Sequence, residues 1–176
     1  MRRCCSLLAK AWLTRIHYGP RAAVGRFDNL PRDLSCAYIR LLWYCASGGG
    51  LTRPEADYLR GIAEVWFPLA HEVSEQIADR VEPPEPSMAD LALLMMAPQE
   101  LRQRVLYDSV LACYMNNNYT TVEQQRVQRV ATALGLKEGT VSALEDIAKK
   151  SWELQQHKVD ILKTTVPTGR GVLCER

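Results

Sequence analysis

Six cysteines and three histidines are the side chains with the greatest potential for chemistry in this sequence. A thiolate can act as a nucleophile and an imidazole as a general base, and both bind transition metals. Their spacing matches no known site, because the sequence contains no Cys-x-x-Cys pair and no two histidines lie one helical turn apart. A catalytic Cys–His pair whose members are distant in the sequence but close in space remains an alternative, although the sequence singles out no such pair. We predict a protein that is not an enzyme and holds no cofactor. The residues are Cys4, Cys5, Cys36, Cys45, Cys113, Cys174, His17, His71 and His157.

Two Thr-x-x-Glu sequences, Thr52–Glu55 and Thr120–Glu123, each follow a polar three-residue turn. At this spacing a Thr hydroxyl accepts from the third helical amide while the Glu returns to the Thr amide, so both mark helix starts. A hard cation requires several oxygen ligands, usually with carboxylates among them. The two glutamates are the only acids near these turns and are already explained as caps. We therefore predict no metal site, and we expect Asn116–Asn118 to form a solvated turn.

The two helix starts belong to a longer repeated pattern. At an offset of 68 positions, apolar residues before and after the turns coincide as well as the caps. The pattern predicts an all-α protein made of two quasi-repeated helical hairpins, although convergence on a common hairpin remains an alternative explanation. Free cysteines pack as small apolar residues, and the aligned cysteines are expected in the core. The aligned pairs are Leu42 with Val110, Cys45 with Cys113, Leu59 with Val127, and Ile62 with Val130.

Proline and glycine predict where the helices begin and end. Pro31 and Pro98 can open helices, because the first helical position needs no amide donor. Pro68 interrupts the helix from Thr52, and Gly135 fits a left-handed helix end. The buried faces are expected to include the residues at helical spacing, and the tryptophans are expected to pack. These residues are Ala37, Tyr38, Leu41, Leu69, Val73, Ile77, Leu101, Val105, Leu144, Ile147 and Ala148, with Trp43, Trp66 and Trp152. A helix from Ser87, a proline-rich connector over 82–86 and a last helix from Val141 to Lys163 complete the prediction.

The repeated pattern resembles a known family. Gly48–Glu55 and Asn116–Glu123 are similar to the two signatures of the tellurite-resistance TerB-like helical domains, over roughly residues 30 to 150. The resemblance implies a TerB-like bundle of two quasi-repeated halves. The acidic turn residue of that family is replaced here by Gly48 and Asn116, so the cation-binding role attached to that acid is not expected to carry over.

Length and charge divide the chain into three parts. With 176 residues, of which 47% are hydrophobic, one core domain is expected. Residues 1–27 carry six basic and no acidic residues, whereas the whole chain has a net charge of only +2, so the remainder is mildly acidic and a nucleic-acid surface is not favoured. We predict a basic arm over 1–27, a TerB-like domain over 28–163 and an extended tail over 164–176.

The basic arm has apolar residues at helical spacing, which is typical of a mitochondrial transit peptide. A secretory signal fits less well because no long apolar region precedes a small-residue cleavage site. A third interpretation is an ordinary docking helix. The targeting and docking interpretations are compatible if the targeting helix is not cleaved and later docks on a partner. Trp12 is the best candidate for a partner contact, because it lies outside the repeat and its ring offers a large apolar area. The full candidate set is Leu8, Trp12, Arg15 and Ile16.

Two functions follow from these features. The first is a noncatalytic accessory subunit of a large mitochondrial assembly in the matrix or on the matrix face of the inner membrane. A respiratory-chain complex or the ATP synthase is the expected host, with the mitochondrial ribosome as a further alternative. The second is a freestanding TerB-like stress or signalling module that binds a cation or small ligand. The longest apolar run, Leu91–Ala97, is far shorter than the roughly 18 residues needed to span a bilayer, so at most peripheral membrane contact is expected.

Overall fold

A computed structural model describes residues 30–79 and 82–165, and these ranges are helical, with no strand. The prediction of an all-α protein is therefore confirmed for the described chain. The helices are α2 (Arg32–Ala46), α3 (Arg53–Trp66), the short 3-10 helix η2 (Pro68–Ala70), α4 (His71–Ala78), α5 (Met88–Met95), α6 (Gln99–Tyr114), α7 (Thr121–Ala133) and α8 (Glu138–Thr165).

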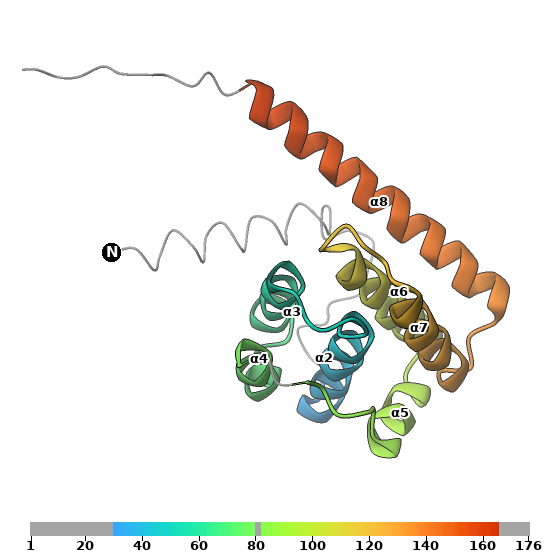
Figure 1. Ribbon diagram of the computed structural model, residues 1–176. Coiled ribbons are helices and arrows are strands. Elements are labelled where there is room, and N and C mark those ends of the chain that lie inside the picture. Colours follow the sequence, from blue (N-terminus) through green and yellow to red (C-terminus); the bar gives the residue numbers. More distant parts are fainter. Residues whose placement is uncertain (1–29, 80–81, 166–176) are drawn as a thin grey trace, which may run out of the picture.

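Helix α2 lies at the centre of the fold. Eleven of its 15 residues are buried, because it packs against α3 and α4 on one side and α5, α6 and α7 on the other (Figure 1). Its sequence has apolar side chains on almost every face, including Tyr38, Leu42 and Trp43. A helix that is apolar all round is stable only when it is surrounded, and α2 meets that condition.

The boundaries that proline, glycine and serine predicted are confirmed. Pro31 and Pro98 each directly precede a helix, and Pro68 starts the 3-10 turn that separates α3 from α4. Ser87 accepts a hydrogen bond from the Asp90 amide at the start of α5. Gly135 has φ of 67°, the left-handed conformation expected after α7.

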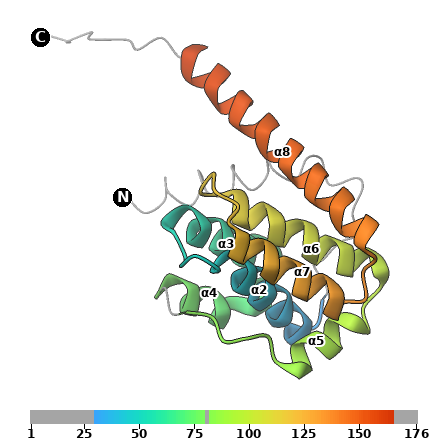
Figure 2. The ribbon, with the colours of Figure 1, turned by 45° about the vertical axis from the view of Figure 1, so that its right-hand side comes forward.

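Helix α8 is longer than the sequence predicted at both ends. It begins before Val141, and it extends to Thr165, so the first residues assigned to the extended tail are helical. It packs along α6, and in two views its last turns stand beyond the other helices (Figures 1 and 2). None of the described helices is long and apolar enough to cross a membrane.

Two expected core positions are wrong. Leu69 and Ile147 are 54% and 52% exposed, whereas Trp66, Trp152 and Leu144 are partly buried and pack against the core. Leu69 lies in the one-turn helix η2, where tight geometry buries Ala70 and turns Leu69 outward. On α8 the buried side is set by Val141 and Ala148, and Ile147 falls one residue away from that side.

A buried polar network fixes α2 against α6. The Tyr38 hydroxyl donates to Asp108 Oδ2 at 2.5 Å, and Arg104 Nε donates to the same oxygen at 2.9 Å. Both Tyr38 and Asp108 are buried. Burial, with the nearby Asp108 charge, raises the pKa of Tyr38 well above its ordinary value, so this hydroxyl stays a donor.

Replacing Tyr38 by Phe should lower the free energy of unfolding by about 1–3 kcal/mol, because a buried carboxylate loses a donor that no water can replace. Urea unfolding followed by circular dichroism measures the effect. Tyr107→Phe is the matched control, since the Tyr107 hydroxyl bonds Ser151 Oγ at 3.2 Å in a partly exposed position. Equal losses in the two variants would contradict a special role for the Tyr38–Asp108 contact.

Candidate functional site

The site with the most concentrated polar chemistry lies where the starts of α3 and α7 meet. Both capping boxes predicted from the sequence are present. Glu55 Oε2 accepts from the Thr52 amide and hydroxyl, both at 2.6 Å. Glu123 Oε2 accepts from the Thr120 amide at 2.7 Å and from its hydroxyl at 2.8 Å. The local geometry of each helix start is therefore the one that the Thr-x-x-Glu spacing dictates.

The tertiary structure brings these two glutamates together, which the sequence did not predict. Glu55 and Glu123 are 0% and 1% exposed, and each lies close enough to the other to affect its pKa. Two neighbouring carboxyl groups without water are more stable when one of them is protonated, because two negative charges repel each other. Two capping residues from separate hairpins thus form a single buried carboxyl pair.

Asn116 completes the contacts of Glu55. Its side-chain amide Nδ2 donates to Glu55 Oε1 at 2.7 Å, and its Oδ1 accepts from the Asn118 amide at 2.7 Å. The expectation of a merely solvated asparagine turn is therefore wrong for this residue, because its amide spans two hairpins. Asn117 also accepts from Trp152 Nε1 at 3.0 Å, so the turn is tied to α8 as well.

Gly48 occupies the corresponding place beside Glu123. A Cβ atom at position 48 would lie 2.9 Å from both Glu123 Cγ and the Glu123 backbone nitrogen. A contact below 3.0 Å to backbone forces that backbone to shift, so only glycine fits here without moving the start of α7. An acidic residue at this position would be excluded for the same steric reason.

The surroundings of the pair disfavour charge. Burial raises the pKa of Glu55 and of Glu123 above the ordinary value of 4.5. The hydrogen bonds from the threonines lower both pKa values, but the effect of burial is larger. The charge of Glu55 further raises the pKa of Glu123. Glu55 accepts three hydrogen bonds that stabilise its ionised form and Glu123 accepts two, so ionisation is less costly at Glu55 than at Glu123.

Cys45 and Cys113 are buried in the core, as the sequence predicted, and they lie near this pair. Burial raises the pKa of the Cys45 thiol to about 12, and burial together with the Cys45 charge raises that of Cys113 well above its ordinary value. A thiol that remains protonated at neutral pH is a poor nucleophile. These cysteines therefore act as small apolar core residues.

Arg126 joins the start of α7 to the end of α2. Its guanidinium donates to the Tyr44 carbonyl at 2.8 Å and to Ser47 Oγ at 3.0 Å, and it lies over the Tyr44 ring. These bonds satisfy groups at a helix C-terminus, where a positive charge is favourable. The sequence did not point to this arginine, because its partners lie 82 and 79 residues earlier in the chain.

The other candidate residues do not join this site. His71 and His157 are exposed on α4 and α8, and no group of three His, Cys, Asp or Glu residues within 30–79 and 82–165 is placed to hold a metal ion. The predicted partner residues lie outside the described part of the chain, as does His17. Those partner residues are Leu8, Trp12, Arg15 and Ile16.

The described fold and site define an all-helical protein in which two Thr-capped helix starts meet at a buried carboxyl pair. No protein-family model matches the chain, and comparisons with curated proteins and with solved structures found no significant match.

Proposed function

We propose that this protein is a noncatalytic accessory subunit of a large mitochondrial assembly, acting through protein–protein contacts. A respiratory-chain complex or the ATP synthase is the proposed host, with the protein in the matrix or on the matrix face of the inner membrane. The observation that carries the proposal is that the polar groups at the two turns, where a ligand of a binding module would sit, are engaged by the chain itself.

The occupied turns favour a rigid scaffold over the alternative, a freestanding module that binds a cation or small ligand. Glu55 and Glu123 use their carboxyl oxygens on Thr52, Thr120 and Asn116. A cation would have to displace these bonds before it could be coordinated. The six basic and no acidic residues of segment 1–27 support the mitochondrial location.

A TerB-like origin for the two hairpins is part of the proposal. The pairs α2–α3 and α6–α7 have the same order of helix, three-residue turn and capped helix. Each turn also contacts the glutamate of the other pair, Gly48 against Glu123 and Asn116 against Glu55. Reciprocal contacts of this kind are expected when two copies of one hairpin pack about an approximate two-fold axis.

Native fractionation tests the proposed function. Mitochondria are extracted with a mild detergent, separated by size, and examined by mass spectrometry for peptides of this chain. We expect comigration with a respiratory complex or the ATP synthase, and an N-terminal peptide will show whether residues 1–27 are retained. Migration near the 19.9 kDa of the chain alone, or absence from mitochondria, would reject the proposal in favour of a freestanding module.

Replacing Trp12 by Ala should release the protein from its host without unfolding it. Loss of an interface tryptophan typically costs at least about 2 kcal/mol, which weakens binding by roughly 30-fold. Retention is measured in the same size separation, and the melting temperature of the isolated protein is the control. A fall in melting temperature of more than about 4 °C in isolation, equivalent to roughly 1 kcal/mol or more, would instead place Trp12 in the core.

A further inference from the structure

The turn between α6 and α7 is held by two different parts of the fold. Asn116 Nδ2 donates to Glu55 Oε1 at 2.7 Å, which binds the start of the turn to the buried carboxyl pair. The next residue, Asn117, accepts at Oδ1 from Trp152 Nε1 at 3.0 Å, which binds it to α8. Neighbouring residues of one turn therefore contact the carboxyl pair and α8.

A second contact with α8 follows the same turn. The Tyr119 hydroxyl donates to Glu145 Oε1 at 2.9 Å. Burial, together with the charge of Glu145, raises the pKa of the Tyr119 hydroxyl well above its ordinary value, so the hydroxyl stays a donor. Glu145 and Trp152 are seven positions apart, which places them on nearly the same side of α8 and about 10 Å apart along it. One side of α8 thus holds the turn at two points.

The backbone of the turn depends on these contacts. Asn117 has φ of 63°, a left-handed conformation that residues other than glycine adopt at a cost and keep only where neighbouring contacts hold it. Here the Asn117 amide donates to the Tyr114 carbonyl at 2.9 Å, and its side chain accepts from Trp152. Asn116 directly precedes this residue, so a change of backbone at Asn117 also changes where the Asn116 amide points.

The corresponding turn of the first hairpin lacks this connection. Residues 48–50 align with residues 116–118 at the offset of 68, and all three are glycines. Glycine has no side chain that could donate or accept a hydrogen bond. The connection is therefore particular to the second hairpin, which contains α6, the helix along which α8 packs.

Helix α8 is suited to opening separately from the core. Among its residues 138–161, whose burial the structure describes, only Val141, Ala148 and Gln155 are buried, whereas α2 buries eleven of its 15 residues. An element with few buried contacts opens locally at a lower free energy than global unfolding requires. Separation of α8 from α6 would break the contacts of Trp152 and Glu145 with the turn.

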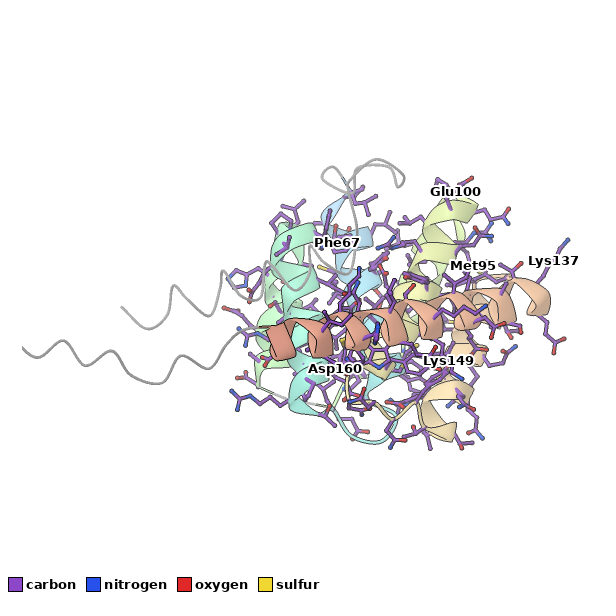
Figure 3. The ribbon with its side chains drawn as sticks, turned by 90° about the horizontal axis from the view of Figure 1, so that it is seen from above. Phe67, Met95, Glu100, Lys137, Lys149 and Asp160 are labelled. Carbon is purple, nitrogen blue, oxygen red and sulfur yellow. The ribbon has the colours of Figure 1, made fainter. Side chains whose placement is uncertain are left out.

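We propose that segment 116–119 links α8 to the buried carboxyl pair, so that separation of α8 from α6 also releases Asn116 from Glu55. Figure 3 shows α8 crossing in front of the other helices, from beside Lys137 towards Asp160. Coupling of this kind is reciprocal, so loss of the Asn116–Glu55 bond makes α8 easier to open. The link goes beyond the proposed function, because it belongs to the chain itself and needs no host assembly.

Native-state hydrogen exchange of the full chain tests the link. Amides in the middle of α8 report the opening of that helix, and amides of α2 report global unfolding. Asn116→Ala should raise the opening constant of α8 by about threefold or more, the range expected for residues in one hydrogen-bond network. In a chain that carries Trp152→Phe and Tyr119→Phe, the same replacement should leave the opening constant of α8 unchanged.

Tyr107→Phe supplies the matched control. The Tyr107 hydroxyl also fastens α8, through Ser151 Oγ at 3.2 Å, but this contact does not involve the turn. Asn116→Ala should therefore keep its full effect on α8 in the Tyr107→Phe background. An equal effect in all backgrounds, no effect in the wild-type background, or α8 amides as strongly protected as those of α2 would overturn the proposal.

The reverse direction is measured without changing Asn116. In the chain with Trp152→Phe and Tyr119→Phe, the side-chain amide protons of Asn116 should exchange with water about threefold faster or more, because the bond to Glu55 is loosened. Tyr107→Phe should leave this rate unchanged. The same rate in the wild type and in the doubly changed chain would overturn the link, even if Asn116→Ala failed to fold.

Discussion

Replacing Glu55 by Gln should lower the free energy of unfolding by about 1–3 kcal/mol at neutral pH, whereas the same replacement at Glu123 should be neutral or stabilising. Both residues hold the same position in a capping box, and Gln can serve in that position. The expected difference arises from the contacts that the two carboxyl groups make outside their own helices.

Glu55 needs both of its oxygens as acceptors. Oε2 accepts from Thr52 and Oε1 accepts from Asn116 Nδ2, so a Gln amide nitrogen would face another donor at one of them. Rotating the Asn116 amide would not help, because its Oδ1 already accepts from the Asn118 amide. Glu123 receives both threonine bonds on Oε2, which leaves the other position free for a Gln amide that donates to Glu55.

The same pair predicts how stability changes with pH. Both folded-state pKa values are raised above the ordinary 4.5, so the folded protein binds more protons than the unfolded chain in the range above that value. The contribution of the pair is fully present below about pH 4.5 and is lost as pH rises through the raised pKa values. Glu123→Gln removes one titrating group and should reduce this loss.

Urea unfolding of the wild type and both variants at about pH 5 and about pH 8 measures these effects. We expect the wild type to lose more stability between the two conditions than Glu123→Gln, and Glu55→Gln to be the least stable protein at the higher pH. Equal destabilisation by the two variants, or a wild type that gains stability from this pair on raising the pH, would contradict the preferential protonation of Glu123.

Gly48→Ala should be the second large effect, with a loss of about 1–3 kcal/mol from overpacking. The added methyl group would meet the Glu123 backbone nitrogen at 2.9 Å, and backbone at a capped helix start cannot move aside as a flexible side chain can. The start of α7 must shift instead, which also disturbs the Glu55–Glu123 contact.

Gly49→Ala is the matched control for this prediction. A Cβ atom at position 49 meets only Thr120 Cγ2, at 3.8 Å, an ordinary van der Waals distance. Both variants change one glycine of the same turn, so unfolded-state effects are nearly the same. Thermal unfolding should separate them by several degrees, since 1 kcal/mol corresponds to about 2–4 °C for a chain of this size. Equal melting temperatures would contradict the close approach of Gly48 to Glu123.

Local signals in the sequence predicted most of the helical framework. A cap and its partner are three residues apart, and proline and glycine act on their own backbone, so Thr52, Thr120, Pro68 and Gly135 could be interpreted without any tertiary information. The aligned cysteines and apolar positions likewise indicated core faces. Helical period alone did not decide which side of α8 is buried, because a 28-residue helix that lies along one neighbour leaves much of its surface outside the core.

The site depended on contacts between distant segments. Nothing in the Thr-x-x-Glu pattern states that the two glutamates lie close together in the core, that Asn116 reaches Glu55 across 61 residues, or that Gly48 lies against the backbone of Glu123. The sequence by itself determined an all-helical chain, two capped helix starts and a basic N-terminal segment, because each depends on neighbouring residues or on composition. Only the tertiary structure decided that the caps meet in a buried interior, since packing around α2 sets which helix starts face each other and are covered from solvent.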